Sequence, residues 1–245
     1  MRIALDAMGG DNAPKSVIKG AHLSLIHHPA IKFLIFGDKN QIEPLLKKHP
    51  ELAEASEVFH TDIAISAHEK PSVALRQGKE SSMQLAINAV KNGVADAAVS
   101  GGNTGALMAM SKLTLRTLPG IDRPAICSLF PTKKGQSVML DLGANSECTA
   151  DNLFQFGIMG DAFARAVLGV KEPTIGLLNI GSEAGKGVDS VRQASEMLTN
   201  TKLPIKYAGF VEGNDADEFD HVLGRQRLEV CAAEERDGQR RSARG

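Results

Sequence analysis

The sequence predicts an α/β protein in which a mainly parallel, mixed sheet is covered by helices on both faces. Short apolar runs rich in β-branched and aromatic residues alternate along the chain with segments of helical periodicity. The 245 residues, 42% of them hydrophobic, are enough to bury a full core. Because α/β sheets of this size often form one domain, we expect one domain rather than two.

Eight segments are predicted to be strands because they are short, apolar and bounded by turn residues. They are Arg2–Asp6, Lys32–Gly37, Glu57–Thr61, Asp96–Ser100, Ala125–Phe130, Ser137–Leu142, Thr174–Ile180 and Ile205–Phe210. Most are followed by a helix, and helices are expected after Pro14, Gln41, Glu80, Thr104, Asp151 and Gly187. The fifth and sixth strands are joined by only a short polar turn, so we expect them to form an antiparallel hairpin.

The composition changes near Asp215. Up to that residue the basic side chains are 16 Lys and 6 Arg, whereas Ala216–Gly245 has 6 Arg, no Lys and 13 charged residues among 30. No strand or helix of clear period can be read in Ala216–Gly245, and Arg236–Gly245 is expected to be disordered. A natural charged tail and a foreign or out-of-frame end are equally compatible with this composition.

Charge and cysteine spacing exclude several classes of protein. The formal net charge of −1 and the sequence pI of 6.7 provide no overall basic field for nucleic acid. Cys127, Cys148 and Cys231 have neither disulfide-framework nor zinc-ligand spacing, which favours a reducing cytoplasm. No signal-peptide pattern follows Met1, and no apolar stretch approaches the ~18 residues of a membrane span, so we expect neither export nor a spanning segment.

Polar, glycine-rich turns follow five of the predicted strands, at the sheet edge where α/β proteins bind ligands. These turns lie at 6–11, 100–105, 141–145, 179–183 and 212–215. A single such turn is well explained by glycine permitting a tight connection. Five of them, several pairing glycine with Asn, Asp or Glu, indicate a binding cleft.

The turn Ser100–Gly105 leads from a predicted strand into a predicted helix, and we expect it to bind phosphate. Glycines let the backbone approach a ligand closely, while exposed N–H groups and the helix dipole favour an anion. Asn103 or Thr104 can equally serve as the helix N-cap, a role compatible with binding. The turn is neither a Walker A loop nor a Gly-x-Gly-x-x-Gly loop, so nucleoside triphosphate and dinucleotide binding are poorly supported.

No conventional nucleophile can be read from the sequence. There is no Gly-x-Ser-x-Gly elbow or reactive-cysteine pattern, and none of the seven histidines lies in the five turns. His27 and His28 are expected at a helix end, His68 is ambiguous, and Cys148 is expected to be a buried or incidental thiol. A catalytic triad is not needed if the nucleophile is already an anion, such as inorganic phosphate, and the electrophile is a thioester.

Several ordered motifs lie within Met1–Asp215. They are Leu5–Pro14, Lys70–Ser72 with Ser81–Met83, Gly102–Met108, Leu140–Asn145, Leu178–Glu183 with Lys186–Gly187, and Gly209–Asp215. On these motifs the chain resembles the bacterial phosphate acyltransferase family, which makes acyl phosphate from acyl-acyl carrier protein and inorganic phosphate for phospholipid synthesis. The resemblance implies a three-layer α/β/α fold like that of phosphate acetyltransferases and isocitrate dehydrogenases, and a homodimer. It also implies a cytoplasmic enzyme resting peripherally at the inner face of the membrane, without metal or organic cofactor.

On this basis we assign candidate site residues in two groups. Catalytic roles are expected for Asn103, Asp141, Asn145 and Lys186, and substrate or phosphate binding for Asp6, Gly10, Asp11, Gly101, Gly102, Thr104, Gly105, Glu183 and Asn214. Lys186 is the candidate charge partner of phosphate or of the oxyanion. An exposed lysine at a helix start is an equally simple explanation of that residue.

The chain departs from the family at three places. The run Gln77–Glu80 is less basic than usual, and Glu147, Ala150 and Asp151 stand where the family has Asp, Pro and Glu. Family members also continue beyond Asp215 with a strand and a loop that completes the site, so we expect residues 1–215 to be a C-terminally incomplete domain with exposed apolar faces and poor stability. A phosphate acetyltransferase-like enzyme acting on acyl-coenzyme A and an inactive remnant that only binds partners remain alternative hypotheses.

Overall fold

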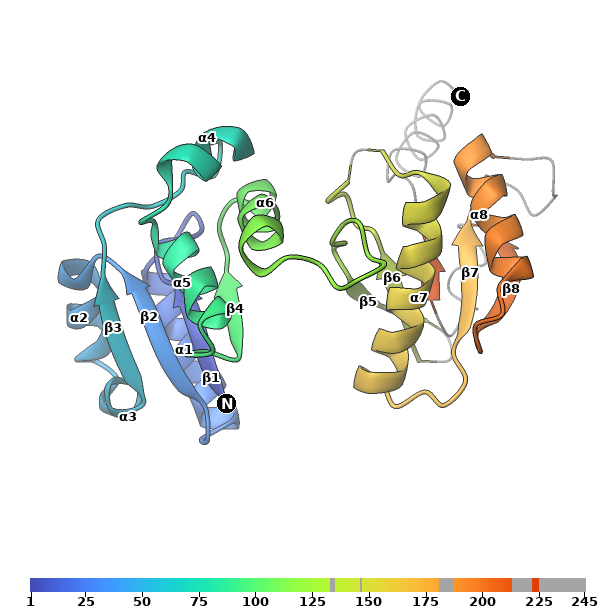
Figure 1. The fold of residues 1–245 in the computed structure, drawn as a ribbon. Coiled ribbons are helices and arrows are strands. Elements are labelled where there is room, and N and C mark those ends of the chain that lie inside the picture. The colour runs from blue at the N-terminus through green and yellow to red at the C-terminus, as the bar shows by residue number, and fades with distance from the viewer. Residues whose placement is uncertain (133–134, 146, 181–186, 213–221, 225–245) are drawn as a thin grey trace, which may run out of the picture. The chain divides into compact units, whose positions relative to one another are not determined.

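The computed structural model describes residues 1–132, 135–145, 147–180, 187–212 and 222–224. The chain divides into two compact units, Met1–Thr117 and Leu118–Gly245, and each has its own sheet (Figure 1). Nothing in the sequence pattern predicts a division at Thr117, and the predicted domain over residues 1–215 includes parts of both units.

The first unit contains a parallel four-stranded sheet in the order β3-β2-β1-β4. Its strands are β1 (Arg2–Asp6), β2 (Lys32–Gly37), β3 (Ser56–His60) and β4 (Ala97–Ser100). All four were predicted, two of them with identical bounds and two within one residue at each end. Because the strands are parallel, their carboxyl ends share one edge of the sheet.

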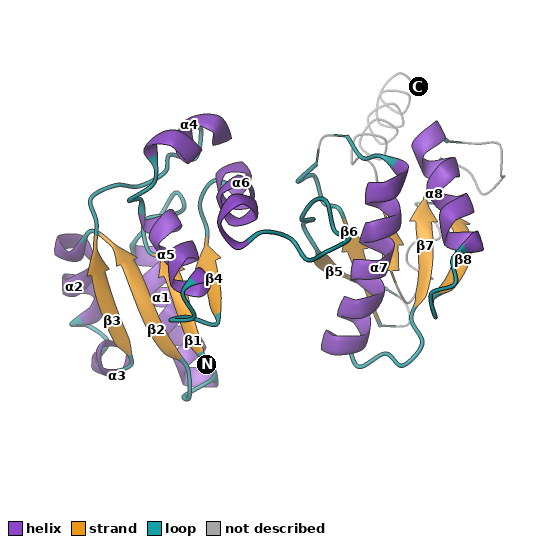
Figure 2. Ribbon diagram, in the orientation of Figure 1, coloured by secondary structure: helices purple, strands orange, loops and turns teal. Residues whose placement is uncertain are grey.

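Helices cover both faces of this sheet, which confirms the predicted layering for the first unit (Figure 2). Ile18 of α1 and Ile42 of α2 pack in one core cluster with Ile35 of β2, whereas Ala86 of α5 packs with Leu34 on the opposite face. The helices of this unit are α1 (Lys15–His27), α2 (Lys39–Leu46), α3 (Pro50–Glu54), α4 (Pro71–Gln77), α5 (Ser82–Lys91) and α6 (Thr104–Leu115).

Two short helices of the first unit, α3 and α4, were not predicted. Each begins with proline in its first turn, a position where the missing N–H of proline costs nothing. Both are too short to carry a readable helical period. His27 and His28 lie exposed at the end of α1, as expected.

The second unit contains a mixed five-stranded sheet in the order β5-β6-β9-β7-β8. Its strands are β5 (Ser128–Pro131), β6 (Gln136–Leu140), β7 (Thr174–Leu178), β8 (Lys206–Val211) and β9 (Val222–Gly224). The antiparallel hairpin of β5 and β6 is confirmed, and the other pairings are parallel. The helices α7 (Ala150–Val167) and α8 (Asp189–Asn200) pack on one shared core cluster with β6 and β7.

Three predictions about this second unit were wrong. Strand β9 lies in Ala216–Gly245, where no strand was expected; three residues are too short for a pattern, and pairing with β6 and β7 on either side holds them in the sheet. The predicted strand from Ala125 begins only at Ser128, since the N–H of Ile126 donates to Asp141 instead of to a strand. The predicted strand to Ile180 ends at Leu178.

Helix α7 begins at Ala150, where the resemblance led us to expect proline in other members. A capping box takes its place: the Thr149 hydroxyl accepts a hydrogen bond from the N–H of Asn152, whose side chain accepts one from the N–H of Thr149. Acidity in the first turn is retained by Asp151. Within the residues described, no helix is long and apolar enough to cross a membrane. Arg236–Gly245 lies outside the described residues.

Candidate active site

The carboxyl end of β1 carries Asp6, whose side chain is only 2% exposed. One carboxylate oxygen accepts a hydrogen bond from the Ser82 hydroxyl at 2.5 Å and a longer one from the N–H of Met8 at 3.3 Å. The other oxygen accepts one from the Ser100 hydroxyl at 2.6 Å. The strand register places Asp6 beside Ser100, and Ser82 is the first residue of α5, so this carboxylate connects β1, β4 and α5.

The turn after β1 packs directly on the turn after β4. A Cβ atom on Gly9 would lie 2.5 Å from a carboxylate oxygen of Asp6 and 2.9 Å from the backbone nitrogen of Gly102. Gly10 has φ +109°, and a Cβ there would lie 3.0 Å from the carbonyl oxygen of Gly101. These glycines are therefore required by the contact of the two turns, in addition to any approach of a ligand.

Asn103 is the N-cap of α6, so the predicted capping role is confirmed for this residue. Its side-chain oxygen accepts a hydrogen bond from the N–H of Ala106 at 3.0 Å. Its side-chain nitrogen lies within 3.1 Å of the carbonyl oxygens of Ser66, Ala67 and Glu69, to which it donates. The amide thereby fastens the 66–69 segment to the start of α6, and its direct role in catalysis stays a prediction.

The backbone N–H groups of this turn fall into two sets. That of Gly102 donates inward to the Ser100 hydroxyl at 3.1 Å. Within the described residues, those of Asn103, Thr104 and Gly105 have no hydrogen-bond acceptor, and Thr104 and Gly105 are exposed. Three available donors at the positive end of a 12-residue helix form a place for an anion.

Asp11 lies exposed on the turn between β1 and α1. The structure thus brings together Asp6, Gly10, Gly101 and Gly102 of the predicted set, and the other three predicted residues of the 100–105 turn begin α6. Of the four, Asp6 is buried and faces protein donors, so its direct contact with phosphate stays a prediction.

In the second unit, Asp141 follows β6 and is 5% exposed. One of its oxygens accepts hydrogen bonds from the N–H groups of Ile126 at 2.7 Å and Ala144 at 3.3 Å. The other accepts from the backbone N–H and the side-chain nitrogen of Asn145, at 2.7 and 2.9 Å. Asn145 also donates to the carbonyl oxygen of Pro124 at 3.0 Å. These two predicted residues are in contact, and together they hold the 141–145 turn against the segment before β5.

Cys148 is buried, as expected from the sequence. Burial raises the pKa of its thiol, the negative charge of Asp141 raises this pKa further, and Arg123 opposes both effects. A thiol with a raised pKa stays protonated at neutral pH, which does not suit a nucleophile.

Three predicted site residues, Glu183, Lys186 and Asn214, lie outside the described residues. Within the described ranges, no group of three or more His, Cys, Asp or Glu side chains could hold a metal ion.

Sequence reasoning did not assign roles to Ser82 and Ser100, although both stand in segments that it singled out. A serine can donate one hydrogen bond almost anywhere, so its partner is visible only in three dimensions. The available signal was Asp6 at the end of an apolar strand, because a carboxylate that is buried there needs hydrogen-bond donors.

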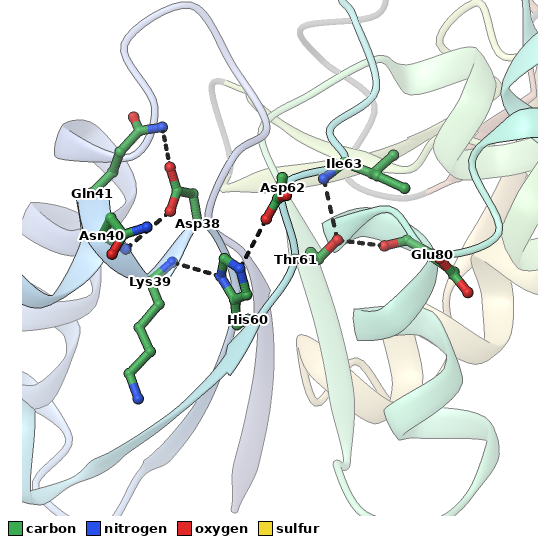
Figure 3. A network of polar contacts seen from close by, with 9 residues as sticks. All are labelled: Asp38, Lys39, Asn40, Gln41, His60, Thr61, Asp62, Ile63 and Glu80. Atoms are coloured by element: carbon green, nitrogen blue, oxygen red, sulfur yellow. Dashed lines mark hydrogen bonds and ion pairs between the residues drawn. The ribbon is translucent and has the colours of Figure 1, made fainter.

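A second polar network lies at the carboxyl ends of β2 and β3 (Figure 3). Asp38 caps α2, and the hydrogen bond from the Gln41 side chain lowers the pKa of its carboxyl group. The ring of His60 accepts the N–H of Lys39 at 3.2 Å through Nδ1, and its Nε2 lies 2.8 Å from Asp62. Through these two contacts His60 connects the start of α2 to the residues that follow β3.

The chain is similar to curated proteins named phosphate acyltransferase. It is 59% identical to that of Rhodospirillum centenum over 213 residues, 87% of this chain and 60% of the relative. It is 55% identical to that of Parvibaculum lavamentivorans over 216 residues, 88% of this chain and 60% of the relative. The chain therefore spans about 60% of the length of these relatives.

Two solved structures share the fold. EutD phosphotransacetylase from Staphylococcus aureus superposes with a TM-score of 0.66 at 16% identity, covering 99% of this chain and 82% of the other. A branched-chain phosphotransacylase from Enterococcus faecalis V583 has a TM-score of 0.60 at 14% identity, covering 95% and 82%. These similarities confirm the predicted fold class.

The family whose model is described as "Fatty acid synthesis protein" matches residues 1–223. The match runs past Asp215, where the predicted resemblance ended, and into β9. Because it includes nearly all of the described residues, the chain belongs to this family.

Proposed function

We propose that the chain is a phosphate acyltransferase that transfers the acyl group of an acyl-acyl carrier protein to inorganic phosphate, in phospholipid and fatty acid synthesis. The observation that carries the proposal is the identity of 59% and 55% to relatives of that name over 87% and 88% of the chain. The outward N–H groups at the start of α6 support it, because they suit a phosphate oxygen.

In this proposal, phosphate binds at the 103–105 backbone, with the Thr104 hydroxyl beside it. A phosphate oxygen attacks the thioester carbonyl carbon; a C–O bond forms, the C–S bond breaks, and the sulfur leaves with the electron pair and is then protonated by solvent. No base has to remove a proton before the attack, because the phosphate oxygen is already anionic. The thiolate is a good leaving group, since a thiol pKa lies near ~8.5.

Lys186 is proposed as the charge partner of phosphate or of the oxyanion, and Glu183 and Asn214 as further binding residues. Asp141 and Asn145 are proposed to hold their turn in the geometry that a substrate requires, because their hydrogen bonds are directed to each other and to nearby backbone.

The activity is tested with the purified 245-residue chain. It is incubated with ³²P-labelled phosphate and a long-chain acyl-acyl carrier protein, and the label is followed into an organic-soluble product that hydroxylamine destroys. We expect incorporation that needs both substrates. A second arm replaces the donor by the matching acyl-coenzyme A, and incorporation in that arm alone would support the acetyltransferase-like alternative. No incorporation in either arm would refute the proposed activity for this chain.

The phosphate site is tested by removing one backbone donor. Thr104→Pro deletes the N–H of the first residue of α6, a position that tolerates proline, and Asn103 before it already has extended ψ of 108°. Thr104→Ala removes the hydroxyl and keeps the N–H. A hydrogen bond to a charged group contributes about 1.5–3 kcal/mol, so we expect phosphate to bind about tenfold or more weakly to the proline variant than to the alanine variant. Equal affinities would exclude this donor.

We further propose that the protein is a cytoplasmic homodimer that associates peripherally with the inner face of the membrane. Sedimentation of the purified chain at increasing concentration tests the dimer, and flotation with anionic vesicles tests the membrane contact. A single sedimenting species of monomer mass would refute the dimer, and recovery of all protein below the vesicles would refute the membrane contact.

A further inference from the structure

We propose that Ser82 and Ser100 are positioning residues that act through the buried carboxylate of Asp6 to hold the 101–105 turn in its phosphate-binding shape. This inference rests on the proposed function. It divides the predicted phosphate loop into an inner part, which is anchored to protein, and an outer part, which meets the ligand.

The first support is the environment of the Asp6 carboxylate. A carboxylate that is 2% exposed is stable only if its oxygens receive hydrogen bonds, and here hydroxyl groups donate to both, at 2.5 Å from Ser82 and 2.6 Å from Ser100. Distances this short are typical of charge-assisted bonds. With both oxygens occupied by protein donors, the carboxylate is an anchor point for the turns around it.

The second support is the double role of the Ser100 hydroxyl. It donates its proton to Asp6 and accepts the N–H of Gly102 at 3.1 Å. Gly102 is therefore turned inward, and the next three N–H groups of the chain are left for an anion. We call these bonds, together with the one from Ser82 to Asp6, the relay. Because a hydroxyl has one proton and the carboxylate can only accept, Ser100 must donate to Asp6 and accept from Gly102.

The third support is the absence of free space around the relay. A Cβ on Gly9 would lie 2.7 Å from the Ser100 hydroxyl oxygen, and one on Gly102 would lie 3.1 Å from the Cα of Gly9. Gly9 therefore packs directly against the relay. In so close a packing, a shift of the Ser100 side chain moves the Gly102 backbone with it, and hence the donors that follow.

A purely stabilising network is the competing explanation, and Ser81 provides a matched control. Its hydroxyl is fully buried, donates to the carbonyl oxygen of Gly78 at 2.6 Å and caps α5 at Gln84. It precedes Ser82 directly and has no hydrogen bond to Asp6 among the described contacts. Loss of either hydroxyl costs stability, but only Ser82 belongs to the relay.

The experiment measures the dissociation constant of inorganic phosphate by calorimetric titration, together with the melting temperature, for the full chain and three variants. Ser100→Ala and Ser82→Ala are expected to bind phosphate about tenfold more weakly, the effect of losing one hydrogen bond of about 1.4 kcal/mol. Ser81→Ala is expected to lower the melting temperature and leave the affinity within twofold of wild type.

Each outcome bears on the inference. Equal weakening in Ser81→Ala, or unchanged affinity in Ser100→Ala or Ser82→Ala, would overturn it. If the variants behave as expected but the wild-type chain forms no acyl phosphate, the proposed function fails and the positioning role stands. If acyl phosphate forms and the serine variants bind phosphate normally, only the positioning role fails. Absence of phosphate binding by the wild-type chain would refute both.

Discussion

Replacing Gly9 by alanine is the most direct way to disturb the contact between the two turns of the first unit. The φ of Gly9 lies outside the left-handed region, so its backbone accepts an alanine and any effect comes from packing. The added methyl carbon would lie 2.5 Å from a carboxylate oxygen of Asp6, 2.7 Å from the Ser100 hydroxyl and 2.9 Å from the backbone nitrogen of Gly102. At least one of these groups must move.

The size of the effect follows from a comparison with a glycine that has open space. Inserting a methyl group into a well-packed site costs about 1–3 kcal/mol. Gly20 lies exposed within α1, and a Cβ there would meet nothing within 4 Å, so Gly20→Ala should stabilise the helix by about 1 kcal/mol. The two variants should therefore differ by about 2–4 kcal/mol, which for a chain of this size is a difference of at least about 4 °C in melting temperature.

The assay is thermal unfolding followed by circular dichroism, with a phosphate titration of each variant. We expect Gly9→Ala to melt below wild type and to bind phosphate more weakly, whereas Gly20→Ala melts slightly above it with unchanged affinity. If Gly9→Ala melts at or above the wild-type temperature and binds phosphate normally, the two turns can accommodate a methyl group, and the reasoning from close packing is wrong.

Four further predictions concern the second unit, two of them Cys148. Asp141→Asn places an amide donor among four N–H donors, so unfolding in urea should require about 2 kcal/mol less free energy than in wild type, and an equal midpoint would contradict the anchoring role. Cys148 should be alkylated by iodoacetamide far more slowly in the native than in the urea-unfolded chain, as mass spectrometry can measure, because burial raises its thiol pKa; fast native alkylation at pH 7 would refute this. Because the pKa of the Cys148 thiol is higher in the folded than in the unfolded chain, its neutral form contributes stability that is complete below the unfolded pKa of about 8.5. This contribution is lost as the pH rises through the folded pKa. Over that pH range the unfolding free energy of wild type should therefore fall more than that of Cys148→Ala. Thr149→Ala removes the acceptor for the N–H of Asn152 and should lower the stability by about 1 kcal/mol, measured by the same urea titration, and a Thr149→Ser control should retain most of it.

The sheet of the first unit was predictable because its strands satisfy two requirements at once. Alternate residues of β1 and β2 enter core clusters on opposite faces, which explains their continuous apolar runs, and each strand ends at a polar turn. Strand β9 (Val222–Gly224) is too short to show either pattern in the sequence. Its three residues are stabilised by neighbours on both sides that are distant in sequence, and no local pattern reports such pairing.

The candidate site was predictable as a place, but the roles of its residues were not. Glycines and acidic residues at strand ends correctly marked the turns that meet in the first unit. The sequence could not separate a side chain that faces a ligand from one that faces protein, and Asp6 and Asn103 prove to be engaged with protein donors and acceptors. That distinction depends on hydrogen-bond partners up to 94 residues away in the chain.

The buried aspartates at the ends of β1 and β6 have a consequence for how activity losses are interpreted. Asp6 and Asp141 each collect donors from segments that would otherwise be separate, so replacing either one changes the shape of a turn before it changes any charge at a ligand. An inactive aspartate variant is therefore no evidence of proton transfer. Thr104 lies exposed beyond this anchor in the first unit, so ligand preference can change during evolution by substitution there while the anchor beneath stays the same.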